Sequence, residues 1–356
     1  MKLKMRPHPE RFEADAGRGG IRVVAIGGGT GLSTLLRGLK GYTVQSGETL
    51  PSGSYISDLT AVVTVSDDGG SSGRLRRELG MLPPGDVRNC LVALSEDENL
   101  LSKLFRYRFS SSGQLEGHSF GNLFLAALTA MTGDFAAAVK KASEILATRG
   151  HILPATSANV ELEALMDDGS RVRGETRINA SEQRIMELSV LPAKPEPLPE
   201  TLVAIAQADV ITIGPGSLFT SLVPNLLVRG IPEAIARSKA IKVFICNLMT
   251  EANESLHMSA SDHVRAINAH AGRGLLNYAL VNAAPISPAM KKRYEEERAE
   301  PVVCDAQVIE QLGVHCISGK FSEEHEVVRH ATDRVCREVL RLAQSSGKEL
   351  QTAGGR

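Results

Sequence analysis

No apolar run in the 356-residue sequence reaches the roughly 18 residues that a membrane-spanning helix needs. The first twenty residues carry five Lys or Arg side chains with no apolar segment after them, so they lack the core of a secretory signal. These absences predict a cytoplasmic protein without membrane insertion. They also predict a flexible N-terminal tail over residues 1–20.

Neither sign of charge dominates, because the sequence has 40 Lys and Arg residues and 41 Asp and Glu residues, which gives a net charge of −1. A protein that grips a nucleic-acid backbone usually carries a clear basic excess, so this balance argues against a nucleic-acid partner. The five cysteines never form a Cys-x-x-Cys pair, and the histidines lack the His-Glu-x-x-His spacing. The sequence therefore predicts reduced thiols and no metal site built from His and Cys.

Short β-branched runs alternate with helical segments along most of the chain. Such runs are typical of buried parallel strands, and they occur at residues 22–26, 59–65, 210–213, 241–246, 276–281, 302–304 and 314–317. Helices are predicted at residues 135–148, 199–208, 261–270 and 287–299, the first with Asp134 as its N-cap and Gly150 just after its end. Strands separated by helices form right-handed βαβ units. The sequence thus predicts a Rossmann-like, doubly wound α/β fold with a mainly parallel sheet.

Residues 151–191 break this alternation. Residues 160–164 alternate between apolar and polar, Asp167-Asp168-Gly169 supplies a turn, and residues 171–178 continue as a second strand. We therefore expect a small antiparallel β insertion here. The predicted organisation is a single nucleotide-binding domain over residues 21–345 with this insertion, followed by a flexible tail over residues 346–356.

The first glycine-rich turn follows the strand at 22–26 and reads Gly27-Gly28-Gly29-Thr30-Gly31. Glycines let a ligand approach the backbone closely, and the N-terminus of the following helix offers N–H groups to an anion. The pattern is not the dinucleotide fingerprint, because its sixth position is Leu, and no Gly-Lys-Ser/Thr of a P-loop follows. We interpret it as a phosphate-binding turn, with a purely structural turn as the alternative.

The second motif follows the strand at 59–65, at the sheet edge where open α/β sheets bind ligands. The adjacent carboxylates of Asp67 and Asp68 can hold Mg²⁺ or accept hydrogen bonds from the hydroxyls of a ribose or sugar. The small residues after them can clamp a phosphate, with an arginine as counter-charge. The alternative is a solvated loop that caps the next helix, which is our interpretation of the second Asp-Asp dipeptide at 167–168. The candidate ligand contacts are Ser66, Asp67, Asp68, Ser71, Ser72 and Arg74.

Three further motifs stand at predicted helix starts. Asp86 is interpreted as an N-cap, with Arg88 and Asn89 in the first turn of its helix. Before the apolar helix at 123–131, the residues that serve as caps or ligand contacts are His118, Ser119 and Asn122. The third motif follows the strand at 210–213 and is a second small-residue anion turn, Gly214-Pro215-Gly216-Ser217. Two such turns and an Asp-Asp loop, all after strands, predict a cleft for a nucleotide or sugar phosphate.

Together these motifs closely resemble those of the bacterial gluconeogenesis factor family, which is related to 2-phospho-L-lactate transferase. The resemblance runs from about residue 21 to about residue 340. The matching segments are Gly27–Ser33, Val65–Arg76, Pro83–Asn89, Gly117–Leu123, Ile213–Ser221, Pro224–Val228 and Asn247–Thr250.

The resemblance implies a Rossmann-type sheet with its ligand cleft at the glycine turns. The related transferase moves a phospholactyl group from a guanylylated donor to a deazaflavin precursor, and its acidic loop handles metal, which would place Mg²⁺ at Asp67 and Asp68. The bacterial branch is associated with growth on gluconeogenic carbon sources and with cell shape. It implies binding of UDP-N-acetylglucosamine or UDP-glucose, with no cofactor, and places Asn225 and the Arg329-His330 pair at the ligand.

This sequence departs from the family at residues 249–258. Relatives read Met-Thr-Gln-x-Gly-Glu-Thr and then an aromatic residue, whereas this chain has Asn253 in place of the Gly and Met258 in place of the ring. These changes remove base or sugar contacts and leave the ligand's identity open. Three classes of function remain: a nucleotide-sugar-binding regulator, a Mg²⁺-dependent transferase, and an NAD dehydrogenase, against which the failed fingerprint counts. A monomer and a homodimer are both compatible with the sequence.

Overall fold

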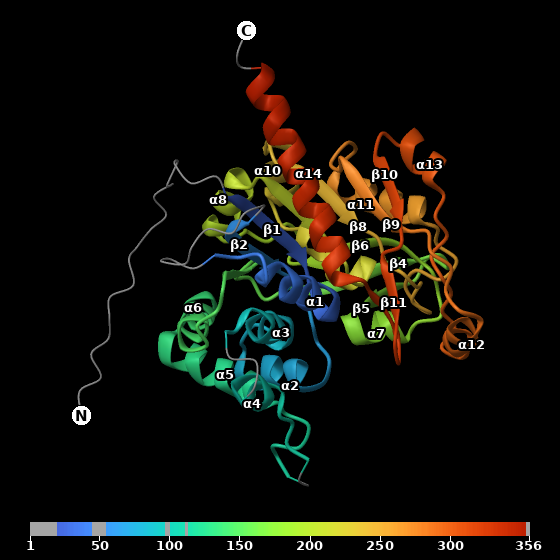
Figure 1. The fold of residues 1–356 in the computed structure, drawn as a ribbon. Coiled ribbons are helices and arrows are strands. Elements are labelled where there is room, and N and C mark those ends of the chain that lie inside the picture. Colours follow the sequence, from blue (N-terminus) through green and yellow to red (C-terminus); the bar gives the residue numbers. More distant parts are fainter. Residues whose placement is uncertain (1–19, 45–54, 97–99, 111–112, 354–356) are drawn as a thin grey trace.

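Seven parallel strands form the central sheet of the protein (Figure 1). The computed structural model describes residues 20–44, 55–96, 100–110 and 113–353. The strands are β1 (Ile21–Gly27), β2 (Ile56–Val63), β3 (His151–Pro154), β7 (Val210–Ile213), β8 (Ile241–Ile245), β9 (Tyr278–Asn282) and β10 (His315–Gly319). They lie in the order β10-β9-β8-β7-β1-β2-β3. The predicted doubly wound α/β fold is confirmed.

The strand order reverses between β1 and β7. From β1 the chain moves outward through β2 to β3, and it later returns to the other side of β1 to build β7, β8, β9 and β10. In an open α/β sheet, ligands bind outside the carboxyl ends of the strands at such a reversal. The two turns that follow β1 and β7 are the two glycine-rich turns of the sequence, so the topology brings both to this position.

Helices cover both faces of the sheet. Because both faces are covered, β7 and β8 are buried at every position, which explains their mostly apolar sequences. The helices are α1 (Gly29–Lys40), α2 (Gly70–Leu79), α3 (Gly85–Leu94), α4 (Leu100–Arg106), α5 (Phe120–Thr132), α6 (Phe135–Ile145), α7 (Glu175–Ala180), α8 (Pro199–Gln207), α9 (Val223–Leu226), α10 (Ile231–Arg237), α11 (Ala260–Ala271), α12 (Pro288–Glu296), α13 (Ala306–Gln311), α14 (Thr332–Ala353) and a π-helical turn η1 (Leu218–Leu222).

The helix α14 packs directly on α1, beside which it lies in Figure 1. A side chain at Gly38 would place its Cβ 2.4 Å from Cγ2 of Thr332, so the two helices meet at close range. The Tyr42 hydroxyl also donates a hydrogen bond of 2.8 Å to Asp333. The strand β12 (Val328–His330), which pairs with β11 (Ser322–Glu324), leads straight into α14. The helix contact therefore holds β12 beside the turn that begins α1.

The predicted antiparallel insertion is present, with different bounds. Its strands β4 (Glu161–Met166), β5 (Arg171–Arg173) and β6 (Ile185–Leu191) lie in the order β5-β4-β6. Residues 151–154 do not belong to it, because β3 pairs in parallel with β2 in the main sheet. The strand predicted at 171–178 ends at Arg173, since Gly174 turns the chain at φ +88° and α7 begins.

Two other predictions about helices and strands were wrong. Residues 302–304 form no strand: the bridge between Met249 and Pro301 stands alone, and proline lacks the N–H that would extend it. Asp134 caps α6 by accepting from the Ala137 N–H at 2.7 Å, but the helix ends at Ile145 and Gly150 is not its C′ residue.

The C-terminal tail predicted from residue 346 is helical as far as residue 353, since α14 continues through it. This stretch contains few apolar residues, so no amphipathic pattern in it indicates a helix. It extends the amphipathic segment that begins α14. The predicted helices at 199–208, 261–270 and 287–299 correspond to α8, α11 and α12. Residues 1–19 of the predicted N-terminal tail lie outside the described residues. Within the described residues, no helix is both long and apolar enough to cross a bilayer.

Candidate functional site

The two glycine turns interlock at the strand reversal. A side chain at Gly31 would place its Cβ 2.4 Å from the Pro215 carbonyl oxygen, and one at Gly216 would lie 3.4 Å from the Gly28 carbonyl oxygen. The Asn225 side chain braces the contact by donating to the Gly27 carbonyl at 3.2 Å and the Ser221 carbonyl at 2.8 Å. The structure therefore brings both predicted turns together and gives Asn225 a bracing position behind them.

The N-terminus of α1 faces this junction. The helix begins inside the glycine turn at Gly29, whose φ of +63° favours glycine, with Gly28 as its N-cap. The Gly29 N–H interacts with the Asp86 carboxylate. The N–H groups of Thr30 and Gly31 occupy the next two positions of the first turn, where an α-helix supplies no internal acceptor. These two groups and the helix dipole form the part of the turn that suits a phosphate.

The second turn differs from the prediction, because a carboxylate already occupies the helix start that follows it. Glu254 is buried and accepts hydrogen bonds from the backbone N–H groups of Phe219 and Thr220, while Ser217 donates to Glu251 at 2.9 Å. Burial first, and the neighbouring Glu251 second, raise the pKa of Glu254 to about 8. The amides at the start of η1 are thus satisfied within the protein. Sequence reasoning missed both glutamates, which lie more than thirty residues away from the turn.

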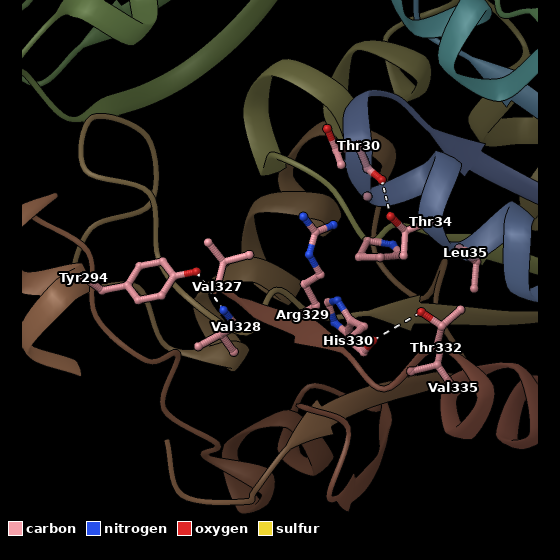
Figure 2. Close-up of a pocket in the computed structure, with 12 residues that line it drawn as sticks. Thr30, Thr34, Leu35, Tyr294, Val327, Val328, Arg329, His330, Thr332 and Val335 are labelled. Carbon is pink, nitrogen blue, oxygen red and sulfur yellow. Dashed lines mark hydrogen bonds between the residues drawn. The ribbon is translucent and has the colours of Figure 1, made fainter. Parts of the chain in front are cut away.

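A pocket of about 300 Å³ opens between α1 and the β11-β12 hairpin (Figure 2). Figure 2 shows Arg329 extending from β12 toward the turn that carries Thr30. The Tyr294 hydroxyl accepts a hydrogen bond from the Val328 N–H at 3.1 Å, which fixes its ring at the other end of the pocket. The lining includes Thr30, Gly31, Thr34, Pro215, Tyr294, Arg329 and His330.

His330 forms part of the wall of this pocket. Its Nε2 lies 3.0 Å from the Cys246 carbonyl oxygen, so the ring donates across the end of β8. Burial lowers the pKa of His330 to about 4, which leaves the imidazole neutral at pH 7. The positive charge in the pocket lining therefore comes from Arg329. The resemblance anticipated Arg329, whereas Tyr294 was missed because no motif surrounds it.

Carboxylates line the opposite flank of the glycine turns. Burial and then Asp67 raise the pKa of Asp86 to about 6, while burial followed by Asp67, Asp86 and Glu254 raises the pKa of Glu175 to about 9. We call these four residues, Asp67, Asp86, Glu175 and Glu254, the carboxylate flank. The predicted N-cap role of Asp86 is wrong: Pro84 is the N-cap of α3, and a side chain at Gly28 would meet the Asp86 carboxylate at 2.7 Å.

The Asp-Asp loop after β2 is partly committed to contacts within the protein. Asp68 accepts from the Thr176 N–H at 2.8 Å and from its hydroxyl at 2.6 Å, so it ties α7 of the insertion to the loop. Asp67 accepts from the Gly69 N–H at 2.8 Å. Among the described residues, no group of three His, Cys, Asp or Glu side chains is placed to hold a metal ion. The loop does not by itself form a protein cage for Mg²⁺.

The remaining predicted residues of this region form a buried network behind the loop. Arg88 donates to Asn122 at 3.0 Å, and the Asn122 amide donates to Ser71 at 3.0 Å. The Ser71 hydroxyl is left to donate to Nδ1 of His118 at 2.9 Å. Ser119 is both the N-cap of α5 and an acceptor for Arg88 at 2.7 Å. These contacts fix the loop in position.

Other predicted contacts have partners within the protein. Ser66 is buried against Thr64 at 3.0 Å, and Arg74 donates to the Glu116 carbonyl. Ser72 lies close to Gly85, where an added Cβ would be 2.5 Å from its hydroxyl. At the departure from the family pattern, Asn253 donates to the Asn179 carbonyl at 2.7 Å and joins this segment to α7.

Comparison with known proteins places this geometry in context. Residues 23–322 match the family model described as 2-phospho-L-lactate transferase CofD. The chain is 48% identical to the gluconeogenesis factor of Halalkalibacterium halodurans over 92% of this chain and 98% of that protein. It is also 48% identical to the gluconeogenesis factor of Bacillus subtilis, over 88% and 95%. A crystal structure of a Bacillus halodurans protein superposes with a TM-score of 0.85 at 48% identity, covering 90% of this chain and 99% of its own.

Proposed function

Because the chain belongs to the gluconeogenesis factors within the 2-phospho-L-lactate transferase CofD family, we propose that it is a UDP-sugar-binding regulator. In this role it supports growth on gluconeogenic carbon sources and cell shape, and it acts in the cytoplasm. The ligand is a nucleotide sugar such as UDP-N-acetylglucosamine or UDP-glucose. The observation that carries the proposal is the pocket between α1 and β12, where a helix N-terminus, an arginine and a tyrosine ring meet.

The diphosphate is assigned to the junction of α1 and β12. Two positive groups lie there: the first turn of α1, with the partial charge of a helix N-terminus, and the guanidinium of Arg329. The guanidinium binds phosphate oxygens through paired N–H groups. Tyr294 offers a ring for the base in a chain that has Met258 in place of the family's aromatic residue. A pocket of this volume lies at the small end of the range for small-molecule sites, which suits a ligand that continues beyond it.

The sugar is assigned to the carboxylate flank, on the other side of the glycine turns. Carboxyl groups there offer no cation to the diphosphate but form hydrogen bonds with sugar hydroxyls, so the two flanks orient the ligand in one direction. Asp67 is the candidate acceptor, since Asp68 already binds Thr176. This arrangement requires neither a metal nor a cofactor.

Thermal unfolding and calorimetric titration with UDP-N-acetylglucosamine, UDP-glucose, NAD and GDP test the proposal. A ligand bound only by the folded state adds about 2.7 kcal/mol at one hundred times its Kd, so a UDP-sugar should raise Tm by a few degrees. The shift should be smaller with NAD. Absence of any shift with either UDP-sugar, alongside binding of GDP, would overturn the proposal.

A Mg²⁺-dependent transferase is the second candidate, favoured by the match to the transferase model and by Asp67 at the sheet edge. It would move a phospholactyl-like group from a nucleotide-activated donor to a hydroxyl acceptor. Mg²⁺ is commonly held by one or two carboxylates together with ligand phosphates and water. Slow consumption of a nucleotide that stops with EDTA and returns with Mg²⁺ would establish this candidate instead.

A further inference from the structure

The short helix α7 of the insertion is fastened at both of its ends. At its start, Asp68 from the loop after β2 accepts from the Thr176 N–H at 2.8 Å and from the Thr176 hydroxyl at 2.6 Å. A side chain at Gly174 would place its Cβ 2.5 Å from the same carboxylate. At its other end, Asn253 from the segment after β8 donates to the Asn179 carbonyl at 2.7 Å. The helix therefore joins two segments that follow strands on opposite sides of the strand reversal.

The segment that carries Asn253 is itself fixed to the main domain. Glu251 accepts from the Ser217 hydroxyl at 2.9 Å, and its own N–H donates to the Ser255 hydroxyl at 3.0 Å. Glu254 accepts from two backbone N–H groups at the start of η1. The side chains of Glu251 and Glu254 thus hold the second glycine turn, while Asn253 between them reaches the insertion. Its amide joins α7 to a firm support.

The first residue of α7 is Glu175, a member of the carboxylate flank. It stands between Gly174 and Thr176, both of which contact the Asp-Asp loop. The helix has six residues, with Ile178 buried, and a helix of that length is not stable on its own. Its position therefore depends on the contacts at its ends. Removing the contact at Asn179 frees the end of the helix and leaves Glu175 less firmly placed.

We propose that Asn253 is a positioning residue for sugar recognition, because its hydrogen bond to Asn179 latches α7, and with it Glu175, at the carboxylate flank. This inference rests on the proposed function, which assigns the sugar of a UDP-sugar to that flank. A latched helix presents its carboxyl group to a sugar hydroxyl without losing further conformational freedom, so less free energy is lost to ordering on binding. Asn253 acts through α7 and not by touching the ligand. UDP lacks the sugar, so its binding does not depend on the latch.

Calorimetric titration of two variants with UDP-glucose, UDP-N-acetylglucosamine and UDP tests the role in binding. Asn253→Ala deletes the amide, and Asn253→Leu keeps a side chain of similar size without the N–H donor. Both should bind the UDP-sugars about three- to tenfold more weakly, the worth of one neutral hydrogen bond, and should bind UDP as the wild type does. A general loss of structure would weaken all three ligands alike. The control is Gln183→Ala, which removes an exposed amide of the same insertion and should change no affinity.

Amide hydrogen exchange of the ligand-free protein tests the latch itself. The Ile178 N–H, which donates to the Gly174 carbonyl at 2.9 Å within α7, should exchange about fivefold faster in both Asn253 variants, while amides of β4 and β6 keep their wild-type rates. Unchanged exchange at Ile178 would overturn the latch, and an equal loss of affinity for UDP and the UDP-sugars would overturn the role in sugar recognition. A wild type that binds no UDP-sugar would refute the proposed function and the sugar role together, and the exchange rates would then still decide whether Asn253 fixes α7.

Discussion

The two flanks of the glycine turns carry opposite chemistry. On the β12 side, Arg329 and Tyr294 offer a cation and a ring, and His330 is held neutral. On the other side, the pKa values of Asp86, Glu175 and Glu254 all rise because the carboxylates are buried close to one another. A diphosphate is therefore favoured on the β12 side, where the cation lies. The difference shows that the two flanks are polarised before any ligand arrives.

The flanks also differ in how they relate to the transferase family. The match to the transferase model spans residues 23–322, which includes the glycine turns and the carboxylate flank and stops before Arg329. The gluconeogenesis factor of Halalkalibacterium halodurans covers 92% of the chain. Asp67 therefore lies within the residues that match the transferase model, and Arg329 lies outside them.

Gly31→Val should have the largest effect, because Gly31 lies between the flanks and serves both. Its Cβ would meet the Pro215 carbonyl at 2.4 Å, so the two turns must move apart. We expect at least about a hundredfold loss of UDP-sugar affinity by calorimetry, roughly 2.7 kcal/mol. Gly113→Ala is the control, since nothing lies within 4 Å of an added Cβ there. Unchanged affinity in a folded Gly31→Val protein would contradict the assignment.

Arg329→Ala should remove the cation from one flank and leave the other intact. Loss of a charge-assisted contact to phosphate costs about 2–3 kcal/mol, which predicts a roughly 30- to 150-fold weaker UDP-sugar. The remaining affinity should depend less on salt. Arg337→Ala removes an exposed arginine that pairs with Asp333 and should change affinity little. Equal effects of the two substitutions would remove Arg329 from the site.

Asp67→Asn tests the opposite flank and should have a smaller effect. We expect about a tenfold loss of UDP-sugar affinity, near 1.5 kcal/mol, because one acceptor for a hydroxyl is weakened. Excess EDTA should leave wild-type affinity unchanged. The matched control is Asp168→Asn in the hairpin turn, whose carboxylate accepts from the Ser170 N–H at 2.9 Å far from the glycine turns. Loss of binding with EDTA would favour the transferase.

The smallest effect concerns stability against pH. Glu175 and Glu254 bind protons more tightly in the folded state, so the free energy of unfolding should fall as pH rises from about 4 to about 9. Glu175→Gln should flatten that fall and raise Tm at pH 8 by about 2 °C. Exposed Glu187→Gln should change neither. A ligand-free protein that gains stability across this range would show that the carboxylate flank is not strained.

Sequence reasoning found the fold and the turns because those signals are local. Strands β1 and β7 are mostly apolar runs, and Gly27 ends the first while Gly214 follows the second, so the sheet rule places their turns together. It missed Glu254 and Tyr294 because their contacts join segments far apart in the chain. Asp86 illustrates the same limit: its position fits a cap, and only the fold shows it facing Gly28 and Gly29.

Strand order also governs how the protein is made. β1 is synthesised early and gains β2 on one edge, but its other edge pairs with β7, which begins only at residue 210. During translation of the intervening residues, that apolar edge offers unpaired N–H and C=O groups to other chains. Nascent chains stalled before residue 213 should therefore be the aggregation-prone form and the natural client of a ribosome-bound chaperone.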